Sequence, residues 1–506
     1  STKLKTHNMA IFAARKNKRM FSFRNISTIL LVFALIFNQA IGQTIQTSDG
    51  DEGTIQLNTI TTAVPFLMIA PDARAGAMGD VGAATDPDGA SIHWNPAKMA
   101  FAPNKMGIAV SYTPWLRALV PDINLAYISG YGKIGKKGLQ TLSGSLRYFS
   151  LGDITFTDNT GQTIGNFNPN EFALDLSYAR KLSEEFSGGI ALRYIYSNLT
   201  GGLNVGGADT KPGQAFAADI SFYYQTLKVE IADKKTVISA GLNISNIGSK
   251  MSYTQTNEED FIPINFRFGV GFKYFIDDRN SIAAFFDINK LMVPTPPVID
   301  NVANFVDDRP FLVDDRHFIA DPRQTIPGRA TGSTITDEYS GNSITLGEVA
   351  NPNYGEENIP NPNYGEENIP NQEYGQETIP NPGYGEIIAG KDPNRSVPNG
   401  MFTSFADAPG GSAEELREIN IAVGLEYWYN KLFAIRAGYF HEHYSKGNRQ
   451  FFTVGAGIRY NVFGLDFAYL IPTQQRHPLE NTLRFTLTFD FEAFKKQNDE
   501  KNDAPD

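Results

Sequence analysis

The sequence predicts an all-β protein, a fourteen-stranded antiparallel transmembrane β-barrel with an N-terminal plug, or hatch, inside it. Three observations support this prediction. Apolar and polar residues alternate in segments of roughly ten residues between Gly107 and Phe491, the connections between these segments alternate in length, and a segment rich in small residues precedes the first of them. Successive side chains of a strand point to opposite faces, so one file can face lipid while the other faces a polar lumen.

The alternation is clearest in residues 172–178 and 483–491. In the first, Phe, Leu and Tyr alternate with Ala, Asp and Ser, and in the second the apolar file is opposed by Arg484 and Asp490. A large soluble all-β protein with its polar file in water is the alternative. The length of about ten residues per segment favours the barrel, because strands of soluble sheets usually have about five or six.

The start of the chain predicts a secretory signal peptide. Basic residues precede the apolar run Ile29 to Phe37, and Ala40 and Gly42 follow at the spacing of a cleavage site, so residues 1–42 form a leader and the mature chain begins near Gln43. A membrane-anchoring helix is the alternative, but the run is shorter than the about 20 apolar residues of a span. The chain has no Cys, which excludes disulfides and thiolate metal sites.

Residues 43–106 are predicted to form a periplasmic N-terminal segment and the luminal hatch. Gly and Ala dominate residues 64–100, and Asp86 to Gly89 carries a turn signal. Small residues let the backbone pack closely against barrel walls. A fourteen-stranded lumen is wide enough to require filling, so this segment is expected to occupy it.

The barrel is predicted to span residues 107–491. We expect strands near residues 107–113, 122–131, 139–149, 171–181, 186–197, 214–226, 236–245, 264–275, 281–289, 419–429, 433–443, 450–460, 463–470 and 482–491. The even-numbered gaps are mostly tight and the odd-numbered gaps contain all the long ones. Bacterial outer-membrane barrels have short periplasmic turns and longer external loops, so we expect extracellular loops and two periplasmic termini.

The longest gap, residues 290–418, is predicted to be an extracellular insertion. It contains decapeptide repeats at 351–390, which are acidic, rich in Pro and Gly and poor in aliphatic residues, so they cannot bury a core. The alternatives are a ligand-recruiting arm with regularly spaced Tyr residues and a weak calcium collector that uses Glu356 and Glu357. Residues 492–506 are expected to form an acidic periplasmic tail.

The segment from Ala83 to Ala97 resembles the hatch of the FadL family of fourteen-stranded outer-membrane proteins. The residues that carry this structural motif are Asp86, Pro87, Trp94, Asn95, Pro96 and Ala97. A narrower resemblance, in residues 70–82, 93–97 and 112–116, is to the FadL-like barrels of the type IX secretion system of Bacteroidetes. The chain departs from this pattern in its decapeptide insertion and in its acidic tail.

The narrower resemblance implies a non-enzymatic component of protein secretion in the outer membrane. Its expected role is to receive cargo with a C-terminal signal domain from the secretion pore and to shuttle it to the cell-surface sortase complex. The partners implied are that pore, the sortase complex, the cargo and outer-membrane lipid. The apolar residues of the first external loop, Trp115, Leu116, Leu119 and Val120, are candidate contacts for a partner or cargo. Alternatively they embed in the outer leaflet or fold back over the lumen.

Two other functions remain open from the sequence. One is a FadL-type channel that passes hydrophobic small molecules through a lateral opening, for which the many Gly residues in the strands would permit bulges. The other is a lipopolysaccharide-modifying hydrolase, which needs a nucleophile oriented by a His. His441 and His443 could hold a metal but lack a third ligand, and His93 is interpreted as a packing residue.

The sequence predicts no catalytic residue, no cofactor and no metal site. It also contains no Gly-rich loop that would bind phosphate. The net charge of −11 argues against nucleic acid as a partner, because a phosphate backbone binds basic surfaces.

Overall fold

The computed structural model describes two stretches of the chain and several short strands between them. It describes residues 58–299 except 118, 121, 136, 158–162, 203, 206–207, 227–228 and 255–258, short strands between 334 and 386, and residues 387–491 except 475–476. The predicted signal peptide, the acidic tail and most of each decapeptide repeat lie outside the described residues. The chain forms two units, one with Ser1–Val293 and Leu416–Asp506 and one with Pro294–Glu415.

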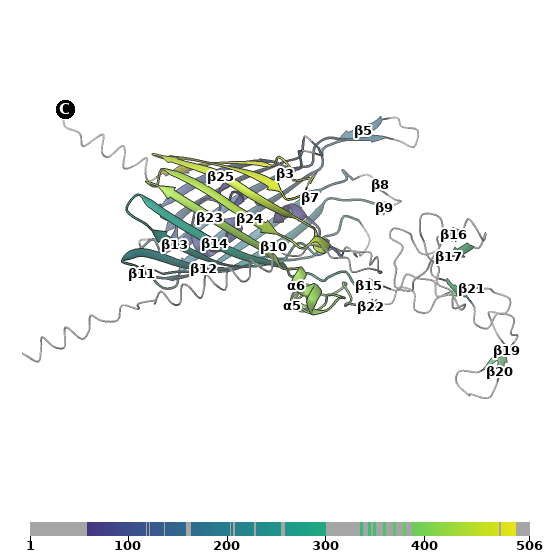
Figure 1. Cartoon of the computed structure of the whole chain (residues 1–506). Helices are drawn as coiled ribbons and strands as arrows, with labels where there is room; N and C mark the ends of the chain where they lie inside the picture. The colour runs from purple at the N-terminus through teal and green to yellow at the C-terminus, as the bar shows by residue number, and fades with distance from the viewer. Residues whose placement is uncertain are drawn as a thin grey trace, which may run out of the picture. The chain divides into compact units, whose positions relative to one another are not determined.

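The first unit is a closed antiparallel barrel of fourteen strands, which confirms the predicted all-β barrel and its strand count (Figure 1). The strands are β1 (Met106–Pro114), β2 (Asn124–Ile134), β3 (Gln140–Ser150), β6 (Asn170–Lys181), β7 (Phe186–Asn198), β10 (Gly213–Gln225), β12 (Lys234–Gly248), β13 (Asn265–Phe275), β14 (Asn280–Leu291), β23 (Asn420–Tyr429), β24 (Phe433–His441), β25 (Gln450–Tyr460), β26 (Phe463–Pro472) and β27 (Leu483–Asp490). Each strand pairs with its neighbours in sequence, and β1 pairs with β27.

The alternating pattern of the sequence becomes an apolar exterior and a polar interior. In β6, Leu174 and Leu176 are 54% and 61% exposed on the outside, whereas Asp175 and Ser177 are buried inside. The outward file matches a lipid-facing surface and the inward file a polar lumen. In the described part of the chain, no helix has the length and apolar character needed to cross a membrane.

The two ends of the barrel differ in the length of their connections. One end, called here the short-turn end, carries tight turns such as those at 182–185, 430–432 and 461–462. Asn430 and Asn461 have φ of 53° and 52°, a left-handed conformation that Asn tolerates well. At this end β11 (Val229–Ile231) extends the β10–β12 connection.

The opposite end, called here the long-loop end, carries the larger connections. They include the hairpin of β4 (Ile154–Thr157) and β5 (Thr163–Phe167), the short pair β8 (Asn204–Val205) and β9 (Ala208–Asp209), and the 3-10 helix η3 (Tyr444–Lys446). The alternation of short and long connections follows the predicted order.

The second unit belongs to the predicted insertion. It contains β15 (Val298–Ile299), paired with β22 (Ile387–Ala389), and the helix α5 (Val397–Thr403), while α6 (Ser412–Arg417) spans its boundary. The remaining short strands are β16 (Thr334–Thr336), β17 (Ser343–Thr345), β18 (Glu348–Ala350), β19 (Asn358–Pro360), β20 (Asn368–Pro370) and β21 (Thr378–Pro380). Strands β19, β20 and β21 occupy the same position in three successive decapeptides.

The pairing of β10 with β12 contains a bulge. Their register shifts between Ala218 and Ile220, and Asn246 takes a φ of 61° in the extra length of β12. The buried Arg193 fills the inner side of the bulge, where it binds Asp175 at 2.5 Å, Asp219 at 3.3 Å and the side-chain oxygen of Asn246. Charged groups inside the wall therefore stabilise an irregular pairing.

Candidate functional site

Residues 58–102, called here the luminal segment, occupy the barrel interior. The segment contains η1 (Pro65–Met68), α3 (Ala73–Gly76), α4 (Ser91–Trp94) and η2 (Pro96–Phe101). Two of these helices begin at side-chain caps: Asp72 accepts from the backbone N–H of Ala75, and Asn95 accepts from that of Ala97. The helices are short because Gly, Pro and turn residues interrupt them.

Inward-facing side chains of ten barrel strands bind the luminal segment by hydrogen bonds. The ten are β2, β3, β7, β10, β12, β13, β14, β23, β25 and β27. Many of the partners are hydroxyl groups, as when Ser187 donates to the carbonyl of Ala97 at 2.7 Å and Ser239 to that of Ala84 at 2.7 Å. These bonds satisfy backbone groups that no regular secondary structure satisfies.

The luminal segment enters at the long-loop end and leaves at the short-turn end. The backbone N–H of Asn58 donates to the carbonyl of Ser445 at 3.1 Å, and that of Ala63 donates to Phe261 at 2.9 Å, both in connections of the long-loop end. The described chain ends at Phe491, beyond β27 at the short-turn end. The first described residues therefore lie at the long-loop end, and the segment traverses the barrel before β1 begins. The two termini lie outside the described residues, and their periplasmic location stays a prediction.

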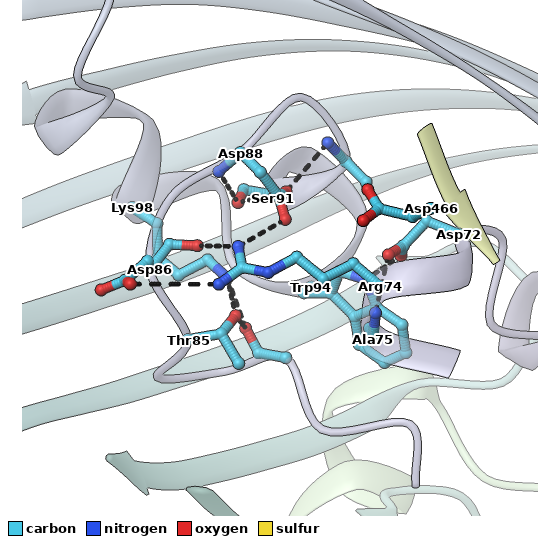
Figure 2. A network of polar contacts seen from close by, with 12 residues as sticks. Asp72, Arg74, Ala75, Thr85, Asp86, Asp88, Ser91, Trp94, Lys98 and Asp466 are labelled. Atoms are coloured by element: carbon cyan, nitrogen blue, oxygen red, sulfur yellow. Dashed lines mark hydrogen bonds and ion pairs between the residues drawn. The ribbon is translucent and has the colours of Figure 1, made fainter. Parts of the chain in front are cut away.

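Arg74 lies at the centre of a buried charge network. Its Nε and Nη2 donate to the two carboxylate oxygens of Glu426 at 2.9 Å each, and its Nη1 donates to Asp88 at 2.9 Å. Figure 2 shows the Arg74 guanidinium between Asp86 and Asp88. Glu426 also accepts from Arg436 at 2.8 Å, so one carboxylate of β23 joins the segment to β24.

Trp94 is packed between the backbone of the segment and the barrel wall. Its indole N–H donates to Asp72 at 2.6 Å, and the guanidinium carbon of Arg267 lies 4.5 Å from the centre of its ring. A Cβ at Gly82 would come within 2.3 Å of the same ring. Glycine is therefore the residue that fits at position 82.

The turn that follows Gly82 is held from two sides. Asp287 of β14 accepts from the N–H groups of Gly82 and Ala83 at 2.7 and 2.9 Å. From within the segment, the buried Lys98 donates to the carbonyl of Gly82 at 2.6 Å and to Thr85 at 2.7 Å (Figure 2). The Asp287 carboxylate thus binds backbone N–H groups of this turn, and the Lys98 ammonium binds a backbone carbonyl of the same turn.

The structure brings most of the predicted hatch-motif residues into this packing. Lys273 binds Asp86 at 2.5 Å, and Asn95 donates to the carbonyls of Ala83 and Phe222 at 3.0 Å each. Pro96 occupies the first position of η2, and Ala97, next to it, donates to Ser221 at 3.0 Å. Trp94 is buried and bound to Asp72, and Pro87 lines a cavity at the short-turn end.

Sequence reasoning missed the residues that hold the segment. They are Arg74, Lys98, Asp287, Glu426 and Arg436. For Asp287, Glu426 and Arg436, the signal was a charged residue at an inward-facing position of a strand. Pairing them required the register between strands that are far apart in sequence.

The four apolar residues of the first long loop divide into two pairs. Trp115 and Leu116 pack against a luminal apolar cluster that includes Met78, Phe440 and Phe451. Leu119 and Val120, by contrast, are 63% and 39% exposed. Leu119 and Val120 are therefore the more exposed pair, because Trp115 and Leu116 are partly buried.

A cavity of about 730 Å³ lies at the short-turn end. Its lining includes the turn from Asp86 to Gly89 together with Lys273, Trp428, Arg459 and Asp490. Asp277, in a turn that also lines the cavity, has a pKa lowered by its side-chain hydrogen bond with Asn280. The lining mixes both signs of charge.

The three His residues considered in the sequence lie in separate settings. His93 Nδ1 lies 2.5 Å from a guanidinium nitrogen of Arg147, His441 ends β24, and His443 accepts from the backbone of Ser445 at the start of η3. Partial burial lowers the pKa of His443, and Arg417 acts in the same direction. No group of three His, Asp or Glu residues suited to a metal ion occurs among the described residues.

Comparison with known protein families finds one that matches part of this chain. Residues 52–298 match the family described as type IX secretion system protein PorV. The resemblance to PorV is confirmed. The PorV-like part includes the luminal segment and the first nine barrel strands, and no curated protein sequence matches the chain.

Several solved barrels are similar to this PorV-like chain at low identity. The toluene transporter TbuX of Ralstonia pickettii has 10% identity and a TM-score of 0.37, with 86% of this chain and 98% of that chain covered. The toluene transporter TodX of Pseudomonas putida has 12% identity and a TM-score of 0.38, with the same coverage. A FadL homologue of Pseudomonas aeruginosa has 10% identity and a TM-score of 0.35, with 86% and 99% covered.

Proposed function

We propose that this chain is an outer-membrane component of the type IX secretion system that hands secreted proteins from the pore to the cell surface. The observation that carries the proposal is the PorV family match over residues 52–298. The protein receives cargo with a C-terminal signal domain from the secretion pore and delivers it to the sortase complex. This function is non-enzymatic, and its chemistry is reversible binding of protein surfaces.

In this proposal the short turns face the periplasm and the long loops face outward. The apolar exterior of the fourteen strands contacts the lipid, as in other bacterial barrels. Cargo and partners bind at the long-loop end, where Leu119 and Val120 are exposed. Transient binding suits a modest contact area.

The luminal segment acts as a plug. Charge pairs, hydrogen bonds and close glycine contacts hold residues 58–102 against the barrel wall. The apolar residues of the interior, including Met78, Phe440 and Phe451, pack against one another. A channel for hydrophobic molecules would need this cluster to open, so the packing favours a carrier over a conduit.

The experiment is deletion of the gene followed by assay of the culture medium and the cell surface. We expect many proteins with the C-terminal signal domain to be lost together from both places and to remain in the periplasm or unprocessed. A plasmid copy of the intact gene restores them. Normal secretion in the deletion strain would overturn the proposal, and loss of uptake of a hydrophobic compound in that strain would favour a channel.

A further inference from the structure

The cavity at the short-turn end lies at the opposite end of the barrel from Leu119 and Val120. Its volume of about 730 Å³ is in the range of known ligand sites. The turn from Asp86 to Gly89 in the luminal segment lines it, and so do the ends of β12, β13, β14 and β23 with the turns that join them. The cavity therefore combines parts of the luminal segment with one section of the barrel wall.

Two aromatic side chains and a small hydroxyl residue lie in one row on this section of the wall. In the strand register Phe275 lies opposite Ser281, and Ser281 lies opposite Trp428, so the three side chains share the inner face. All three line the cavity. Because Ser281 is much smaller than its two neighbours, an apolar side chain of a ligand has room over it, between the two rings.

Donor groups without a partner surround these rings. The indole N–H of Trp428 donates to no atom within the described part of the chain. Lys235, Arg279 and Lys431 also line the cavity and form no ion pair with the residues that the structure describes. The Lys235 ammonium lies 5.1 Å from the centre of the Phe275 ring. The cavity therefore presents several positive groups that a ligand can neutralise.

The carboxylates of the cavity are mostly occupied by other groups of the chain. Asp86 binds Lys273 at 2.5 Å, and Asp490 accepts from Asn104 at 2.5 Å. Asp278, in the β13–β14 turn, is the exception, because it binds no group in the described ranges. The excess of free donors favours a ligand with carboxylates, while the nearby acidic groups disfavour one that is negative along its whole length.

We propose that this cavity binds an acidic peptide segment of a protein on the short-turn side, which is the periplasm in the orientation proposed above. Carboxylates of the peptide pair with Lys235, Arg279 and Lys431, and an apolar side chain packs over Ser281. The peptide backbone alternates N–H donors with carbonyl acceptors, so an N–H group can donate to Asp278. This site goes beyond the proposed handoff of cargo, whose candidate contacts lie at the long-loop end.

The experiment measures peptide binding to the purified full-length protein in detergent by fluorescence anisotropy. The probe is a dye-labelled, capped hexapeptide of glycine and glutamate with a central leucine. A counterpart with lysine in place of glutamate tests the sign of the charge, and empty micelles give the background. Unlabelled trigalacturonate, which carries carboxylates but no peptide groups, is added as a competitor. We expect the glutamate peptide to bind and the lysine peptide not to bind.

Variants test the two parts of the site. Ser281→Leu fills the space between the rings and should weaken binding about tenfold or more, whereas Ile282→Leu, on the outer face, should change it less than about twofold. Lys235→Glu with Lys431→Glu should also weaken binding about tenfold or more. Lys137→Glu is the matched control, because Lys137 is exposed in another short turn and does not line the cavity.

Heat-dependent electrophoretic mobility confirms that each variant is folded, and the charge-reversal variant carries the test if Ser281→Leu does not fold. Absence of binding to the intact protein, equal binding of the lysine peptide, or unchanged binding by the folded charge-reversal variant overturns the proposal. Displacement of the peptide by an equal concentration of trigalacturonate overturns the assignment to a peptide. The assay contains no cargo, so its failure is distinct from failure of the proposed function.

Discussion

Arg74 and Glu426 form a bidentate ion pair between the luminal segment and the barrel wall, with both N–O distances at 2.9 Å. Both side chains are buried, and the residues are 352 positions apart in sequence. The pair joins the first part of the chain to one of its last five strands. The position of the luminal segment therefore depends on a strand near the end of the sequence.

Glu426→Ala is expected to destabilise the folded barrel by about 3–5 kcal/mol, because it leaves Arg74 and Arg436 buried without their shared carboxylate. The measurement is urea-induced unfolding of the purified protein in detergent, followed by heat-dependent mobility. Glu184→Ala, at an exposed turn, is the control and should change stability by less than about 0.5 kcal/mol. Equal stability of the two variants would show that the network does not hold the segment.

Gly438→Ala is expected to displace the luminal segment, because the added methyl group would lie 2.1 Å from the backbone of Met78. Overpacking of this kind costs about 1–3 kcal/mol. The control is Gly132→Ala in β2, where the new Cβ has no atom within 4 Å. Limited proteolysis of intact barrels should cut within residues 58–102 more readily in the first variant only, and equal resistance of both would contradict the close contact.

Leu119→Ser with Val120→Ser is expected to reduce export or surface attachment of cargo while leaving barrel stability unchanged, because both side chains are exposed. Trp115→Ala, which removes a ring packed on the luminal cluster, should instead lower stability by about 3 kcal/mol. Surface proteomics and urea unfolding separate the two effects. Normal cargo export by the double variant would exclude this part of the loop as a contact.

Asn246 at the barrel bulge permits a test of backbone conformation. Asn246→Gly and Asn246→Ala both remove the side chain that binds Arg193. Of the two, only Ala is strained at a φ of 61°, because it has a Cβ. We expect the Ala variant to be less stable than the Gly variant by about 1 kcal/mol. If Ala is equally stable, the bulge must rearrange at little cost.

The strands could be predicted because alternation is a local property, and all fourteen lie within a few residues of their predicted positions. The inward-facing charges of β6 and β23 were visible at the polar positions of alternating segments, yet Asp175 and Glu426 acquire partners only when distant parts of the chain come together. The division of the first long loop, with Trp115 inside and Leu119 outside, depends on a cluster formed by distant strands. The direction of the luminal segment likewise rests on two backbone hydrogen bonds that no side-chain pattern encodes.

The pairing of β1 with β27 joins the first barrel strand to the last. During synthesis the residues that fill the lumen emerge before any part of the wall, and the wall is complete only when Leu483 to Asp490 have been made. A buried residue of the luminal segment such as Arg74 can therefore pair with Glu426 only after β23 has been synthesised. The luminal segment is therefore synthesised before the barrel that encloses it.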